Sequence, residues 1–393
     1  MRAVTRSICR GPGRSVISPY EPHQHHQPYL PYLPYPPNLP HLPDPRRDMI
    51  RSMADAPFLP AGKLPAAALE AMLSRIPRDD ARVVIGASPG EDAAVLDIGD
   101  RYLVVTTDPI TFASDRIGWY SVHVNANDIA VLGARPRWFF AVLLLPEHGS
   151  RASTAEAITA DIAQTCATLG VSLCGGHTEI TTGLERPIVV GQMLGEVEKD
   201  RLLRKDRLEV GDRLLLTRGA ALEGTAILAR EKREVLETRL DAVVIAGAQR
   251  LLFEPGISIV EAAQTAGSAG RVRAMHDPTE GGVATGLWEL ARAGGRGLRV
   301  RADAIPILPE TRAVCDVLGL DPLRLIASGA LLVAADARDA LAIRRALDTR
   351  GIPAVDIGEV RPAEEGVRIE VAGRWQVLEP ADRDEIARVF ARL

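Results

Sequence analysis

A charged segment near the middle of the chain, Glu198–Glu209, does most to limit the fold. Nine of its twelve residues carry a charge, which marks a polar break between two halves. A chain of 393 residues is long enough for two domains. We therefore expect an N-terminal domain over residues 55–205 and a C-terminal domain over residues 206–393.

Both halves mix short β-rich runs with helical patterns. Leu69, Met72, Leu73 and Ile76 recur at helical spacing, so Pro65–Ile76 is expected to form a helix. Further patterns predict both helices and strands. The helices are expected at Trp119–Leu132 and Gly282–Ala293, and the strands are expected at Trp138–Leu145, Val171–Cys174 and Arg271–Met275. Because strands and helices alternate irregularly, the pattern favours two α+β domains over one doubly wound sheet.

The first 48 residues differ from the rest. They hold 11 of the 28 prolines and 4 of the 8 histidines, with a Pro-Tyr-Leu repeat near the period of polyproline II. We expect residues 1–54 to be a disordered tail, or upstream sequence before a start at Met49 or Met53. A Pro-rich docking tail and a His-rich metal-binding tail are the alternatives.

Composition excludes several classes of protein. A net charge of −4 gives no sign of a nucleic-acid surface. Four scattered cysteines without C-x-x-C spacing argue against a zinc site or a disulfide framework, and they fit a reducing cytoplasm. No run of about 18 apolar residues is present, so we expect no membrane-spanning helix.

Five clusters combine small residues with acids at the ends of predicted elements. They are Gly90–Val95, Thr106–Pro109, Asn125–Ala130, Gly175–Glu179 and His276–Gly282. Carboxylates on separate loops suit Mg²⁺ bound to a polyphosphate, because Mg²⁺ prefers oxygen ligands. Glycine lets backbone N–H groups approach phosphate oxygens, and Gly281–Gly282 opens a helix whose N-terminus favours an anion.

Each cluster alone also has an ordinary structural explanation. Acids at strand ends are commonly turn formers, and Asn127 and Asp128 could lie on an exposed helix face. His177 and His276 could be hydrogen-bonded histidines without a functional role. Gly219–Thr225 has P-loop spacing but lacks the lysine before Thr225, so we reject a Walker A site.

Taken in order, the five motifs resemble those of the AIR synthase-like (PurM-like) superfamily, over roughly Val83–Val360. Within it, the chain is most similar to the HypE and AIR-synthase-related branch of hydrogenase maturation proteins. The resemblance implies a two-domain α+β subunit whose N-terminal domains pair into a homodimer through their sheets, with ATP in a cleft at that interface. It also implies an ATP- and Mg²⁺-dependent enzyme that activates a small substrate by phosphoryl transfer.

The resemblance also implies roles for individual residues. The expected Mg²⁺ ligands are Glu91, Asp92, Asp108 and Asp128. The expected nucleotide contacts are Asn127, Gly175, Gly176, His177, Glu179, Gly281 and Gly282. The expected catalytic residues, which face the transferred group from the second domain, are His276 and Asp277.

One departure from the branch matters. Its carbamoyl dehydratases end in a tail whose last residue is a cysteine, whereas the last cysteine here is Cys315. Two alternatives therefore stay open: a non-catalytic nucleotide-binding scaffold in a maturation complex, and a dehydratase whose acceptor cysteine lies elsewhere. Selenophosphate synthetase is disfavoured, because no early reactive Cys or Lys on a Gly-rich loop is evident.

Overall fold

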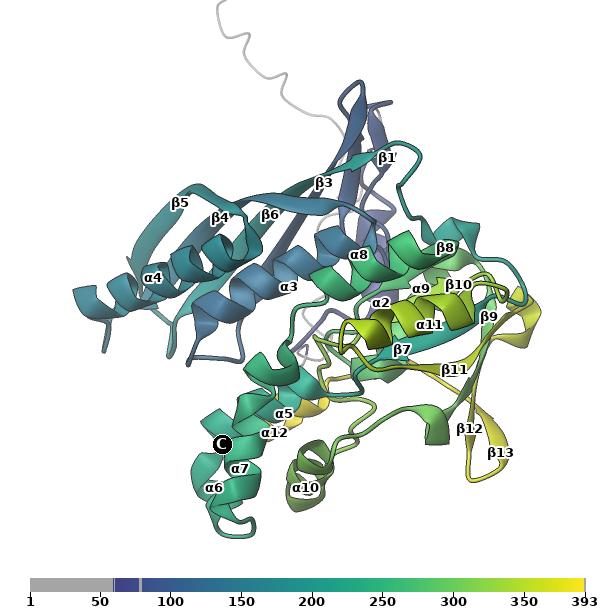
Figure 1. Ribbon diagram of the computed structural model, residues 1–393. Helices are drawn as coiled ribbons and strands as arrows, with labels where there is room; N and C mark the ends of the chain where they lie inside the picture. The colour runs from purple at the N-terminus through teal and green to yellow at the C-terminus, as the bar shows by residue number, and fades with distance from the viewer. Residues whose placement is uncertain (1–58, 60, 78–79, 392–393) are drawn as a thin grey trace, which may run out of the picture. The chain divides into compact units, whose positions relative to one another are not determined.

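Two β-sheets organise the part of the chain that the computed structural model describes, which is Leu59, residues 61–77 and residues 80–391 (Figure 1). The expectation of a mixed α+β architecture is confirmed. The expected tail over residues 1–54 lies outside the described residues. Helix α2 (Ala66–Leu73) precedes the first sheet, and it is shorter at both ends than the expected Pro65–Ile76.

The first sheet has six strands in the order β1-β2-β3-β6-β4-β5. Neighbouring strands are antiparallel except for β4 and β5, which run parallel. Its elements in chain order are β1 (Val83–Ile85), β2 (Ala94–Asp97), β3 (Arg101–Ile110), α3 (Ile117–Val131), β4 (Arg135–Pro146), α4 (Ala152–Leu169), β5 (Ser172–Thr181) and β6 (Ile188–Glu198).

Helices α3 and α4 cover one face of this sheet (Figure 1). Glycines in β6 let α3 come close to the sheet. A Cβ at Gly191 would lie 2.4 Å from Asn125 Nδ2, and one at Gly195 would lie 2.3 Å from Ile129 Cγ2. All residues of α3 except Trp119 are buried, including its polar ones. Polar residues that sequence alone could assign to an exposed helix face are therefore held inside the protein.

The second sheet has seven strands in the order β13-β12-β9-β11-β7-β10-β8, and only β12 and β9 run parallel. Its strands are β7 (Arg213–Thr217), β8 (Val272–His276), β9 (Gly297–Arg301), β10 (Leu332–Ala335), β11 (Ala354–Arg361), β12 (Val367–Val371) and β13 (Arg374–Val377). The central strands β7 and β10 are almost wholly buried, as their apolar runs require.

Helices pack around the second sheet and against the first. They are α5 (Leu222–Glu231), α6 (Arg233–Glu237), α7 (Ala242–Arg250), α8 (Val260–Ala269), α9 (Gly282–Gly294), α10 (Pro309–Leu318), α11 (Ala340–Thr349) and α12 (Glu385–Phe390). Short turns occur at Lys205–Arg207, Leu252–Gly256, Ala302–Ala304 and Ala363–Glu365. One hydrophobic cluster joins α3 and the first sheet to α5 and α7, so the two halves share buried apolar surface.

The cluster Thr106–Pro109, expected at the end of an element, forms the last part of β3, where ten consecutive residues pair with β6. One expected strand end was wrong. Strand β5 extends beyond Cys174 to Thr181, because it pairs with β4 along its whole length. The glycine-rich cluster Gly175–Glu179, expected as a loop after a strand, is therefore part of an edge strand.

No single helix among the described residues has the length and apolar character needed to cross a bilayer. Only a bent pair, Ala242–Gly256 with Val260–Ala269, reaches that length and composition when its two parts are taken together.

Candidate functional site

Four segments that are far apart in the chain meet beside the end of β8. Asp92 lies in the loop before β2, Lys205 begins the turn after β6, His276 ends β8 and Glu289 lies in α9. The pairing of β8 with β10 fixes the backbone of His276, and Asp277 follows it directly. The second sheet therefore positions His276 and Asp277 next to the loop before β2, which contains Asp92 and comes from the first half of the chain.

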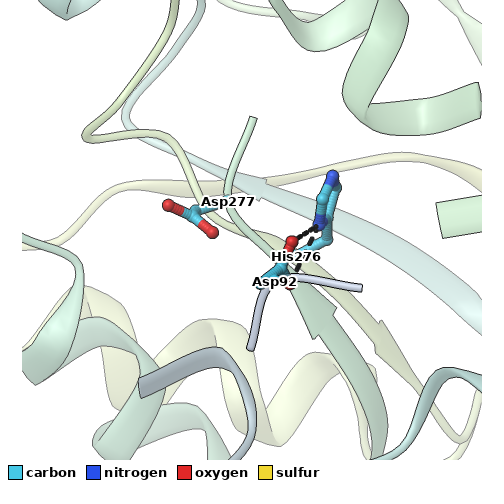
Figure 2. A group of neighbouring side chains, drawn as sticks. All are labelled: Asp92, His276 and Asp277. Carbon is cyan, nitrogen blue, oxygen red and sulfur yellow. Dashed lines mark hydrogen bonds and ion pairs between the residues drawn. The ribbon is translucent and has the colours of Figure 1, made fainter. Parts of the chain in front are cut away.

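The Lys205 ammonium lies at the centre of this group, and its side chain is only 1% exposed. It donates to the Gly90 carbonyl oxygen and, at 2.7 Å, to Asp92 Oδ2. His276 Nδ1 lies 2.9 Å from Asp92 Oδ1 and 3.1 Å from Asp92 Oδ2 (Figure 2). Its Nε2 lies 3.0 Å from Glu289 Oε2. We call Asp92, Lys205, His276 and Glu289 the ion-pair cluster.

The opposite charges in the ion-pair cluster stabilise one another, and they outweigh the effect of Lys205, which lowers the pKa of His276. Burial alone would lower the pKa of His276, but Asp92 and Glu289 raise it to about 9. Burial opposes the ionised form of Asp92, yet His276 and Lys205 hold its pKa well below the ordinary value. Lys63 and His276 similarly lower the pKa of Glu289 to about 2. At neutral pH, His276 is therefore an imidazolium that donates from both ring nitrogens.

Three further carboxyl groups gather next to the ion-pair cluster, and we call Asp108, Asp128 and Asp277 the acid group. Thr106 Oγ1 lies 2.7 Å from Asp128 Oδ2 and 3.1 Å from the backbone carbonyl oxygen of Asp92, so it links the two clusters. Burial raises the pKa of Asp128 well above its ordinary value, and the nearby Asp108 and Asp277 raise it further.

The carboxyl group of Asp277 is buried without a hydrogen-bond partner among the described residues, and the residue is 1% exposed. Burial raises its pKa well above the ordinary value, with Asp92 adding to the effect. Glu91, expected as a Mg²⁺ ligand, is similar, because its buried Oε2 is also unpartnered in the described structure. Burial likewise raises the pKa of Glu91.

These carboxyl groups fit a divalent cation. A buried, unpartnered carboxyl group is costly, and a cation bound to it would restore the lost interactions. The donors are almost all oxygen atoms, which suits Mg²⁺. One atom each from Asp92, His276 and Asp277 also lies within 4.8 Å of the others. The structure therefore places Asp92, His276 and Asp277 close together, and the oxygens of Asp277, unpartnered among the described residues, are open to a cation.

Two of the expected nucleotide contacts have internal partners in the structure. The Asn127 side chain accepts from Ile259 N at 2.9 Å and donates to the Ile257 carbonyl oxygen at 2.9 Å, which joins α3 to the segment before α8. At the start of α9, the backbone N–H of Gly281 donates to the buried carboxyl group of Asp384. Gly281 and Gly282 do adopt positive φ angles, of 82° and 66°.

The four expected contacts on β5 lie elsewhere in a single copy of the chain. Gly175, Gly176, His177 and Glu179 are all exposed. Strands β3, β6 and β4 separate β5 from β2, where the Asp92 loop ends. With about 4.8 Å between neighbouring strands, that is a distance on the order of 19 Å. His177 and Glu179 face each other, with 3.6 Å between Nε2 and Oε2.

Two lysines of the site were missed in the sequence. Lys205 lies among the nine charges of Glu198–Glu209, so nothing in the pattern distinguishes it from a solvated linker residue. Lys63 follows Gly62, and its Nζ lies 3.0 Å from Thr279 Oγ1 and 3.4 Å from Glu289 Oε1. Lys63 follows a single glycine rather than a Gly-rich loop, so the sequence analysis did not select it. A Gly-Lys pair just before a predicted helix was the available signal.

Comparison with known families finds two matches in this chain. Residues 90–197 match the N-terminal domain of AIR synthase related proteins, and residues 209–370 match the C-terminal domain of the same family. The N-terminal match ends just before the charged segment Glu198–Glu209, and the C-terminal match begins at its last residue.

Individual relatives agree with this. A Methanocaldococcus jannaschii protein named for hydrogenase expression and formation is 30% identical over 314 residues, covering 78% of this chain and 90% of the relative. The carbamoyl dehydratase HypE of Escherichia coli is 30% identical over 309 residues, covering 74% and 86%. A crystal structure of the hydrogenase maturation protein HypE in complex with ATP superimposes with a TM-score of 0.63 at 25% identity, covering 79% and 92%.

Proposed function

Because the chain belongs to the AIR synthase-related family, on the branch that contains the HypE proteins, we propose that it is an ATP- and Mg²⁺-dependent enzyme that activates a small substrate by phosphoryl transfer. The observation that carries the proposal is the buried, unpartnered carboxyl group of Asp277, which lies beside Asp92 and Asp128. A relative whose crystal structure contains ATP supports the choice of nucleotide.

The site residues would have different roles in binding the cation and the phosphates. Asp277, Asp128 and Asp108 would hold Mg²⁺, which neutralises phosphate charge when it is bound. In addition to the Mg²⁺ ion, the Lys63 ammonium would supply a positive charge at Thr279, near the acid group. Because the imidazolium of His276 is held at both nitrogens, it is suited to orienting Asp92 rather than to removing a proton from a substrate. Phosphoryl transfer requires mainly such positioning and charge neutralisation.

A second copy of the chain would complete the nucleotide site. Within the described part of the chain, helices cover only one face of the first sheet, and the other face carries half-buried apolar side chains, among them Phe140, Val142 and Leu144. The edge strand β5 is exposed along nearly its whole length. Pairing of two such sheets would bury this surface and bring the exposed Gly175–Glu179 segment to an interface, where it could contact ATP. Sedimentation of wild type and Val142→Glu tests this, since the charged variant is expected to be monomeric.

We also propose that the substrate reaction belongs to hydrogenase maturation, with another maturation protein as partner, because the named relatives act there. Carbamoyl transfer to a cysteine of this chain has less support. Cys166 and Cys315 are buried, and burial raises the pKa of each thiol to about 12, which makes both poor nucleophiles. Cys174 is the exposed thiol among the described residues.

Calorimetric titration of the whole protein with ATP, with and without Mg²⁺, tests the proposed function. Asp277→Asn should remove Mg²⁺-dependent ATP binding, because it removes a carboxylate from the cation site. The matched control is Asp348→Asn on the exposed surface of α11, which should bind as wild type does. Unchanged Mg²⁺-dependent binding in a folded Asp277→Asn protein would refute the assignment.

A further inference from the structure

The buried ammonium of Lys205 lies next to a group of side chains that could bind a metal ion. The three side chains whose ligand atoms lie within 4.8 Å of one another are Asp92, His276 and Asp277. The Lys205 Nζ atom lies 2.7 Å from Asp92 Oδ2 and 3.1 Å from His276 Nδ1, so its ammonium already contacts two of the three. A divalent ion bound between Asp92 and His276 would lie against this ammonium and be repelled by it.

Each Asp92 oxygen already has a cationic neighbour, because Oδ2 accepts from Lys205 and Oδ1 lies 2.9 Å from His276 Nδ1. Lys205 additionally donates to the backbone carbonyl oxygen of Gly90, so one side chain holds both ends of the Gly90–Asp92 loop. Asp277 presents the opposite situation, because neither of its oxygens has a partner in the described part of the chain. The two aspartates are therefore not equivalent.

We propose that Lys205 is a positioning residue that serves as the resident cation of Asp92, so that the divalent ion binds Asp277 and Asp128 instead. Lys205 then fixes the Gly90–Asp92 loop against the end of β8 and leaves the acid group to receive the metal. This inference rests on the proposed function, and it assigns Asp92 to holding the site together rather than to metal coordination.

Titration with Mn²⁺ in the absence of nucleotide, followed by the paramagnetic resonance signal of the free ion, tests this inference. Lys205→Met removes the ammonium at similar side-chain length and leaves Asp92 Oδ2 and the Gly90 carbonyl oxygen without their cation. We expect this variant to bind one additional Mn²⁺ ion per chain, and we expect Asp92→Asn in the same background to abolish that additional ion. Lys199→Met, in the same charged segment but partly exposed, is the control and should bind as wild type does.

Failure of Lys205→Met to gain an ion in a folded protein would overturn the proposal, since a merely structural lysine predicts no gain. If Lys205→Met does not fold, single substitutions in the wild-type chain decide. Asp277→Asn should lose the bound Mn²⁺ whereas Asp92→Asn should keep the same number of ions, and loss in both would overturn the inference. Wild type that binds neither Mn²⁺ nor Mg²⁺–ATP would refute the proposed function, while a gain in Lys205→Met would still support the role of Lys205.

Discussion

The ion-pair cluster predicts a pH dependence of stability that a single substitution should remove. In the folded protein the pKa of His276 is raised from an ordinary value of 6.5 to about 9, because Asp92 and Glu289 favour the imidazolium. A raised pKa stabilises the folded state fully below pH 6.5, and this contribution is lost as the pH rises towards 9. At 1.36 kcal/mol for each pKa unit, the loss is roughly 3 kcal/mol. His276→Gln keeps a polar side chain but cannot carry the charge.

The free energy of unfolding by urea, measured between pH 6 and 9.5 without divalent ions, checks this prediction. Wild type should lose roughly 3 kcal/mol relative to His276→Gln across that range, with most of the change above pH 6.5. His148→Gln, which alters an exposed histidine, should follow the wild-type curve. Parallel curves for wild type and His276→Gln would show that His276 is not a buried imidazolium, and the electrostatic reasoning would fail.

Three further predictions concern packing and charge. Asn127→Ala leaves a buried carbonyl oxygen and a buried N–H without partners, so the free energy of unfolding should fall by roughly 2–5 kcal/mol. Gly191→Ala places a Cβ against the Asn125 amide and should cost about 1–3 kcal/mol in thermal unfolding, whereas Gly267→Ala, with open space, should not destabilise. Lys63→Met should change stability by less than about 1 kcal/mol, because its side chain is 50% exposed, yet weaken Mg²⁺–ATP binding measured by calorimetry.

The sequence predicted the elements well where apolar periodicity was strong. The helices expected at Trp119–Leu132 and Gly282–Ala293 agree with α3 and α9 to within two residues at each end, and the α+β architecture is as expected. Strand ends were less accurate, since pairing with a neighbour determines where a strand stops. Strand β5 shows this, because its glycines suggested a loop while its partner β4 continues for the full length of the strand.

The candidate site was predictable in part. Asp92, Asp128, His276 and Asp277 lie in clusters of acids and small residues, which form a recognisable pattern, and the fold does bring them together. The two lysines beside them carry no such pattern. Lys205 is one of many charges in its segment, and only the path of the chain after β6 shows that its ammonium is buried. Long-range ion pairs of this kind depend on tertiary geometry, which no local window of sequence contains.

The position of Lys205 restricts how the connection between the two sheets can vary. Surface linkers commonly tolerate insertions and deletions. Here, one added residue before the turn at Lys205–Arg207 would move the ammonium by up to about 3.5 Å, farther than its 2.7 Å contact with Asp92. A chimaera that exchanges either half with a relative must therefore preserve the length of this connection, and a change of length there would be expected to harm the site before it harms either sheet.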